Sequence, residues 1–176
     1  RDWSSDVCSS DLLAATSSSS YGYFGGGYTP PLYINTISRL DFSNETVSDP
    51  GKNLPSERLL LAATSSSSYG YFGGGSIPPV TTNVRINTIS RIDFSNETTS
   101  NPGKNLPTAR NEVSATSSTS YGYFGGGFAP PYINTISRID FPNETVSDPG
   151  KNLPSTTTSL TATASSFYGY FGGGNT

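Results

Sequence analysis

The sequence predicts an all-β repeat protein built from four-stranded antiparallel blades, and three observations support this. The motif Tyr-Gly-Tyr-Phe-Gly-Gly-Gly begins at residues 21, 69, 121 and 168, so it recurs after 48, 52 and 47 residues. Gly or Pro interrupts the chain nearly every ten residues, and no segment keeps a helical period. Four short strands fit into each unit, which is the pattern of a propeller blade.

The first two strands of a unit are expected at a run of small residues and at the aromatic motif. In the second unit, Leu59–Thr64 is apolar and then small, and four serines separate it from Tyr69–Phe72. Short runs bounded by turn residues favour strands. The glycines that follow suit a bulge or a close backbone approach, where a Cβ would not fit. The glycines expected at these strand ends are Gly25, Gly26, Gly73, Gly74, Gly125, Gly126, Gly172 and Gly173.

We expect Ala62, Ala63 and Gly70 to lie in crowded innermost strands, with Tyr, Phe and Ile filling the space between blades. The third strand is expected over Ile86–Phe94, followed by a tight turn at Ser95–Thr98 in which Asn96 is able to adopt the left-handed conformation. A short fourth strand around Thr98–Ser100 should end at the Pro-Gly step of residues 101–104.

Three complete blades and part of a fourth are expected, with approximate bounds 13–56, 57–108, 109–155 and 156–176. Closed propellers contain four to eight blades, so about three and a half blades should form an open arc with exposed ends. Terminal repeats without caps are expected to fray.

The first twelve residues differ from every repeat. From Asp2 onward, residues 1–12 resemble the translation of a short-read sequencing adapter, and they are not expected to belong to the fold. They contain the only Cys and the only Trp, at positions 8 and 3. This resemblance implies a fragment of a longer gene, read from an environmental sample.

Composition argues against several classes of function. Without residues 1–12 the net charge is close to −1, so no basic surface is expected for nucleic acid. There is no long apolar run, and hence no expected membrane insertion. The repeats contain no His, Met or Cys, which are common metal ligands, bases and nucleophiles. We therefore expect no cofactor, no metal and no catalytic residue.

The whole unit resembles the Kelch repeat. The resemblance is carried by the aromatic strand that ends in glycines, by Asn87–Phe94, and by the Leu-Pro-x-x-Arg segments Leu54–Arg58 and Leu106–Arg110. The chain lacks the Trp usual after the third strand, and Thr157 replaces the Arg in the last unit. The resemblance implies an outlying Kelch-like propeller. A related galactose-oxidase-like enzyme would need a copper site with His and Cys.

Arginine and aspartate recur two residues apart on the third strand. We expect these side chains to join blade to blade or to fix the following turn; a carbohydrate or cation site is the alternative. The pairs are Arg39 and Asp41, Arg91 and Asp93, and Arg138 and Asp140. The Asn-Glu-Thr tripeptides after them match the N-glycosylation pattern, but their periodic position favours a structural turn.

The loops after the triple glycines are the expected binding surface, because the repeats differ there and rigid scaffolds display function on loops. They are Tyr28–Tyr33, the longer Ser76–Arg85, and Phe128–Tyr132. Solvent-facing variation without a role is the alternative. The candidate contact residues are Tyr28, Tyr33, Ile77, Arg85, Phe128 and Tyr132.

We therefore expect a non-catalytic binding or structural module that recognises a protein or a glycan. The Gly, Ser, Thr and Tyr content favours an extracellular or virion-associated setting, such as a phage fibre or a cell-surface protein. An intracellular scaffold and the propeller part of an enzyme with its catalytic residues elsewhere are the alternatives. The missing blades of the parent chain are a further expected partner.

Overall fold

The structure is a computed structural model, and it describes residues 12–79, 82, 84–165 and 167–176. The adapter-like residues 1–11 and positions 80, 81 and 83 of the long second loop lie outside the described residues. Within the described residues all regular structure is β-strand. That part of the chain has no helix that could span a membrane.

Three four-stranded antiparallel sheets and the two-stranded sheet β17–β18 follow one another along the chain, and two further two-stranded sheets, β3–β4 (Tyr28–Thr29 and Leu32–Tyr33) and β9–β10 (Ser76–Ile77 and Val84–Arg85), are hairpins of the first two units. The first sheet contains β1 (Ala14–Ser17), β2 (Tyr21–Gly25), β5 (Ile37–Asp41) and β6 (Val47–Ser48). The second contains β7 (Ala62–Ser65), β8 (Tyr69–Gly73), β11 (Ile89–Asp93) and β12 (Thr99–Ser100). The third contains β13 (Ser114–Ser117), β14 (Tyr121–Gly125), β15 (Ile136–Asp140) and β16 (Val146–Ser147). The last contains β17 (Thr161–Ala164) and β18 (Gly169–Gly172).

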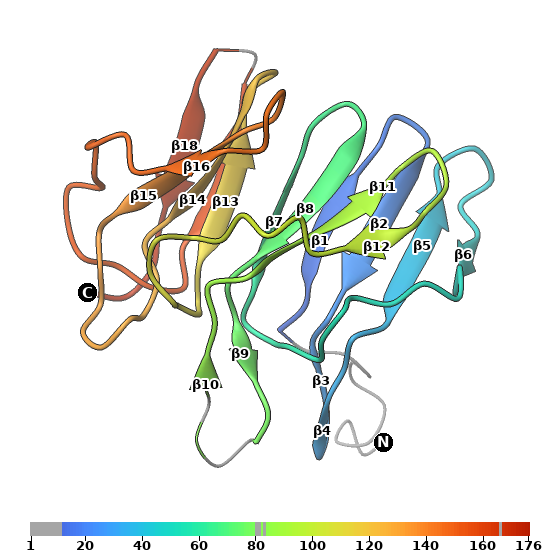
Figure 1. The fold of residues 1–176 in the computed structure, drawn as a ribbon, viewed down its shortest axis with the longest axis horizontal. Helices are drawn as coiled ribbons and strands as arrows, with labels where there is room; N and C mark the ends of the chain where they lie inside the picture. Colours follow the sequence, from blue (N-terminus) through green and yellow to red (C-terminus); the bar gives the residue numbers. More distant parts are fainter. Residues whose placement is uncertain (1–11, 80–81, 83, 166) are drawn as a thin grey trace, which may run out of the picture.

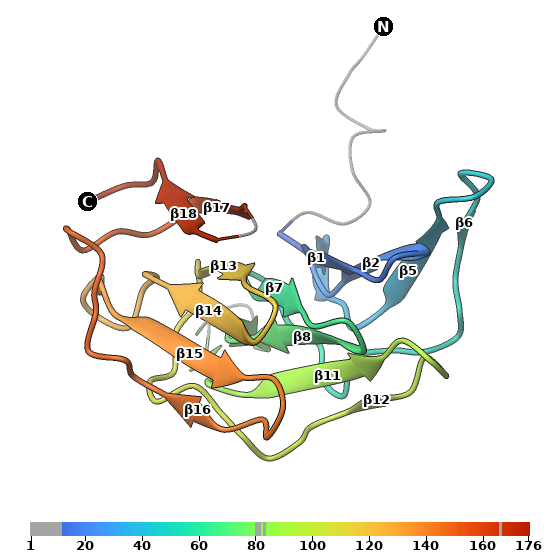
Figure 2. The same cartoon turned by 90° about the horizontal axis from the view of Figure 1, so that it is seen from above.

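The sheets stand side by side as blades around an arc (Figures 1 and 2). The first strands of the four units, β1, β7, β13 and β17, contact one another in succession along its inner side (Figure 2). The later strands of each sheet lie progressively farther out. The predicted all-β, propeller-like arrangement of three and a half blades is confirmed.

The third strand is shorter than predicted. It covers Ile89–Asp93, whereas Ile86–Phe94 was expected. The preceding residues bond to loops: the Ile86 N–H donates to the Gly75 carbonyl at 3.0 Å, and the Asn87 side chain donates to the Leu106 carbonyl at 3.0 Å. The strand pattern of the sequence therefore extends to Ile86, but this segment bonds to loop carbonyls instead of to β8 and so lies outside the sheet.

Neighbouring blades interlock through their second strands. Phe72 projects back onto Gly25 of the preceding blade, and Phe124 projects back onto Gly73. A methyl group on Gly73 would lie 2.6 Å from the Phe124 ring, so the glycine leaves room for that ring. Tyr71 projects the other way and stacks on Phe141 with ring centroids 5.4 Å apart. The predicted aromatic packing between blades is confirmed.

Gly70 shows the predicted crowding of the inner strands. A methyl group placed on it would lie 2.6 Å from Cγ2 of Thr16 in the preceding blade. The glycines after the strand satisfy a second constraint. Gly74 has φ +68° and a Cβ there would lie 2.7 Å from the Arg110 carbonyl oxygen, which confirms the expected close backbone approach.

The Leu-Pro-x-x-Arg segments place fully buried arginines beneath the blades. Arg110 donates to the carbonyls of Phe124 and Thr135 at 3.0 and 3.1 Å, and to Ser137 Oγ at 2.9 Å. Arg58 donates to Thr88 and Ser90 in the same way. Burial lowers the pKa of both guanidinium groups to about 10. Each arginine thus fixes the third strand of its own blade to the incoming chain.

Candidate functional site

The arginines of the first two third strands, Arg39 and Arg91, join two blades, but their partners are not the nearby aspartates. Arg39 Nη1 lies 2.9 Å from Glu97 Oε1, and the Tyr23 hydroxyl donates to the same oxygen at 3.1 Å. The second interface repeats this with Arg91 and Glu144 at 2.8 Å. Glu97 and Glu144 come from the Asn-Glu-Thr turns of the following blade. Sequence reasoning treated these tripeptides only as turns and missed their glutamates.

The turn at this tripeptide differs from the predicted one. The sequence suggested that Asn96 could adopt the left-handed conformation, but the residue that adopts it is Glu97, with φ 59°. Asn96 Oδ1 accepts hydrogen bonds from the Thr98 N–H at 2.9 Å and the Thr98 hydroxyl at 2.7 Å. Because the side chain of Asn96 closes the turn, the next residue makes the reversal, and this aims the Glu97 carboxylate at the preceding blade.

The aspartates fix the start of that turn, as predicted. Asp93 Oδ1 accepts the Ser95 hydroxyl at 2.6 Å and the Ser95 N–H at 2.8 Å, and these bonds lower the pKa of Asp93. Asp41 is held by Ser43 in the same way. The third unit differs because Pro142 occupies the serine position and offers neither donor. Asp140 Oδ1 is buried there without a hydrogen-bond partner.

The proline loops form short hairpins along one side of the arc, at the same end of each blade (Figure 1). The first consists of β3 (Tyr28–Thr29) and β4 (Leu32–Tyr33), and the second of β9 (Ser76–Ile77) and β10 (Val84–Arg85). In the third unit a single bridge joins Phe128 to Tyr132. Each hairpin contains a cis Pro-Pro bond, at residues 30–31, 78–79 and 130–131.

Aromatic contacts hold these hairpins together. Tyr28 and Tyr33 meet edge to face with centroids 5.9 Å apart, and Phe128 meets Tyr132 at 5.2 Å. The Arg85 guanidinium lies 4.3 Å from the centroid of Phe128, so the second hairpin contacts the third. These contacts form two separate groups, the pair Tyr28 and Tyr33 and the cluster of Arg85, Phe128 and Tyr132, while Ile77 pairs with Val84 in the β9–β10 ladder.

The predicted residues differ in exposure. Tyr132 is 39% exposed, whereas Tyr33 is buried at 4% and therefore supports its hairpin from within. Tyr28, Ile77, Arg85 and Phe128 are partly buried. Two more exposed side chains lie on the hairpins and were missed: Leu32 at 65% and Val84 at 45%. An apolar residue directly after Pro-Pro, as in Leu32 and Tyr132, was the available signal.

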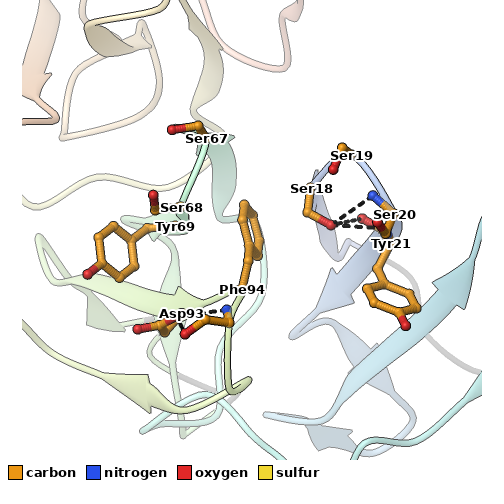
Figure 3. A pocket seen from close by; sticks show the side chains of 10 residues that line it. Ser18, Ser19, Ser20, Tyr21, Ser67, Ser68, Tyr69, Asp93 and Phe94 are labelled. Carbon is orange, nitrogen blue, oxygen red and sulfur yellow. Dashed lines mark hydrogen bonds between the residues drawn. The ribbon is translucent and has the colours of Figure 1, made fainter.

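The opposite end of the blades carries hydroxyl-lined grooves. A groove of about 450 Å³ separates the first two blades, between Ser18–Tyr21, Ser67–Tyr69 and Asp93–Ser95 (Figure 3). Ser18 Oγ accepts the Tyr21 N–H at 3.0 Å, so this hydroxyl is part of the β1–β2 turn. A similar serine-lined groove of about 420 Å³ follows between the next two blades. The serine runs had been interpreted only as connections.

The first groove presents hydroxyl groups and a single carboxylate. Asp93 is the one carboxylate that lines the first groove, and Ser95 already binds it. Over the described ranges, no three His, Cys, Asp or Glu side chains gather as a metal site would require.

No protein-family model matches the chain, and a search of curated proteins finds no match either. The resemblance to Kelch repeats therefore stays a prediction, while the blades themselves are seen directly in the structure.

Proposed function

We propose that the chain is a non-catalytic binding module that recognises a protein partner through its proline hairpins. One observation carries this proposal: the hairpins of three successive units each expose an apolar side chain, namely Leu32, Val84 and Tyr132. Monomeric surfaces seldom gather such side chains on neighbouring loops without a partner. A fibre or surface protein of a virion or cell is the proposed setting.

The chemistry of the hairpins favours a protein over a glycan. Leu32 and Val84 are aliphatic, and aliphatic side chains gain free energy by burying area against other apolar groups. Arg85 and Tyr132 are of the types that dominate binding energy at protein interfaces. Glycan recognition would instead rely on hydrogen bonds from polar groups, to which Leu32 and Val84 contribute none.

The scaffold supports selective binding because it is nearly constant while the hairpins vary. Backbone pairing between β3 and β4 and between β9 and β10, with the ring contacts described above, limits the motion of the displayed side chains. Preorganised loops lose less entropy on binding. Different hairpins on equal blades can therefore define one composite surface.

The test selects peptide binders against the immobilised chain, and applies the same chain to a glycan array. The variant Leu32→Ser/Val84→Ser/Tyr132→Ser should lose at least about tenfold in affinity for the selected peptides, which corresponds to about 1.4 kcal/mol. The matched control Ser19→Ala/Ser67→Ala/Thr119→Ala alters the opposite end and should bind normally. Peptides insensitive to the first variant, or glycan binding alone, would contradict the proposal.

A further inference from the structure

Arginine side chains lie over aromatic rings at four places in the described chain, and at two of them a carboxylate completes the arrangement. Arg39 Cζ lies 4.8 Å from the centroid of the Tyr21 ring, and Arg39 Nη1 lies 2.9 Å from Glu97 Oε1. The next interface repeats this with Arg91, whose Cζ lies 4.4 Å from a ring centroid and whose Nη1 lies 2.8 Å from a glutamate oxygen. In both cases Nε is buried without a hydrogen-bond partner, so a terminal nitrogen makes the polar contact.

Arg85 has the aromatic ring but lacks the carboxylate. Its Cζ lies 4.3 Å from the centroid of Phe128, the shortest of the four distances, and its Nε is likewise buried without a partner. Among the described residues, the salt bridges belong to Arg39 and Arg91, and none reaches Arg85. The described chain thus holds this guanidinium group as it holds the other two, but leaves its charge unpaired.

The blade repeat does not supply a carboxylate at this position. The glutamates of the Asn-Glu-Thr turns pair with arginines of third strands, whereas Arg85 lies on β10 and already contacts the following blade through Phe128. Tyr33 and Tyr132 occupy the same hairpin position in the first and third units, because they pair with Tyr28 and Phe128 in the corresponding register. Of these three hairpins, only the second therefore carries an arginine.

The surroundings of Arg85 combine a positive charge with apolar surface. The three proline loops, 28–33, 76–85 and 128–132, contain no Asp or Glu. Tyr132 meets Phe128 edge to face with centroids 5.2 Å apart and is 39% exposed, so an accessible ring lies beside the ring that holds the guanidinium group. A ligand that fits this place needs a negative group and, next to it, an apolar one.

We infer that the partner of the hairpins presents a carboxylate beside an apolar side chain. The carboxylate pairs with the guanidinium group of Arg85, and the apolar side chain packs on Tyr132. Hydrogen bonds between a guanidinium group and a carboxylate are about twice as strong as neutral ones, and stacking on Phe128 orients the donors before the partner binds. The inference rests on the proposed binding function and specifies the partner chemistry that it selects. An Asp or Glu side chain and a C-terminal carboxylate share this chemistry.

Three sets of short peptides test the inference. The first set has one Glu between two apolar residues and an amidated C-terminus, the second has Gln in place of the Glu, and the third has this Gln and a free C-terminal carboxylate after an apolar residue. At least one carboxylate set should bind at least about tenfold more tightly than the second set, and added salt should reduce the difference. The set that binds identifies the source of the carboxylate. Equal binding of all three sets, or binding of none, would overturn the inference.

Substitutions of Arg85 make the test specific. Arg85→Gln should remove the difference between the sets, and Arg85→Lys should restore only part of it, because lysine keeps the charge but lacks the planar group that stacks and donates two parallel hydrogen bonds. The matched control Lys104→Gln removes one positive charge from an exposed turn and should keep the full difference. Equal losses for Arg85→Gln and Lys104→Gln would show that only net charge matters and would overturn the inference. Circular dichroism checks the folding of each variant; should Arg85→Gln fail to fold, Arg85→Lys is compared with the control.

The outcomes separate this inference from the proposed function. The variant Leu32→Ser/Val84→Ser/Tyr132→Ser should weaken the binding of every set that binds, because it removes the apolar contacts. Peptides that need these three residues but bind Arg85→Gln normally would support the proposed function and overturn the inference. Peptides that bind both variants normally would contradict both.

Discussion

The packing of each phenylalanine onto the preceding blade predicts that phenylalanines at the same strand position contribute very differently to the free energy of unfolding. Phe124 and Phe24 both follow the second tyrosine of the aromatic motif. Phe124 is fully buried against Gly73, whereas Phe24 is 37% exposed in this chain. The substitutions Phe124→Ala and Phe24→Ala therefore remove the same atoms from different surroundings.

The magnitude for Phe124→Ala follows from burial and from the lack of compensating side chains. Fully burying a phenylalanine contributes about 1.5–3 kcal/mol by transfer alone. The facing residue is glycine, which has no side chain to move into the space, so a cavity term adds to the loss. A loss of about 3–5 kcal/mol in the free energy of unfolding is expected. Phe24→Ala should cost less than about 1.5 kcal/mol, because much of its ring is already in water.

The assay is urea unfolding followed by circular dichroism. Repeat proteins can unfold in parts, so tyrosine fluorescence should be recorded beside the backbone signal. Equal losses for the two variants would refute the reasoning, as would a loss for Phe124→Ala below that of Phe24→Ala. Either result would mean that blades do not interlock through this ring.

Three further predictions concern the backbone, the turns and pH. Gly74→Ala should lower the free energy of unfolding by about 3 kcal/mol, because the alanine would have a left-handed φ and its Cβ would lie 2.7 Å from a carbonyl oxygen. Gly51→Ala has a similar φ but open space around its Cβ, so it should lower the free energy by only about 1 kcal/mol, measured by thermal unfolding. Pro142→Ser should restore two donors to Asp140 and raise the free energy of unfolding by about 1 kcal/mol, and no gain would contradict the role of Ser95 in the second unit. Burial, and then the nearby Glu144 carboxylate, raise the pKa of the Tyr71 hydroxyl. The unfolded chain therefore loses this proton at a lower pH than the folded chain, and stability falls as the pH rises above about 10. Tyr71→Phe should flatten the fall in melting temperature between about pH 9 and pH 11, and an unchanged slope would argue against the contact between Tyr71 and Glu144.

Much of the fold could be predicted from the sequence because its signals are local. The period of the aromatic motif, the glycines after it and the serine and proline interruptions specify strand, turn and strand again without reference to distant residues. Gly70 and Gly74 were correctly assigned to crowded positions for the same reason, since a missing side chain in a repeated motif indicates close approach. The predicted third strand began too early, at Ile86, because the apolar pattern of the sequence starts before the hydrogen bonds to β8 do.

The candidate site was predicted less completely because its contacts join distant parts of the chain. The hairpins were located from their variation, but only the structure separates the exposed Leu32, Val84 and Tyr132 from the buried Tyr33. Exposure of a short hairpin depends on how it lies against the neighbouring blade, and Arg85 reaches Phe128 across that boundary.

The sequence by itself determined the repeated blade and the positions of its turns, because strand and turn preferences act over a few residues. Only the tertiary structure decided that Arg39 pairs with Glu97 of the next blade and that Phe124 packs onto Gly73 of the preceding one. The physical reason is that these partners are set by how blades stack, which brings together residues about one repeat apart that no local preference connects.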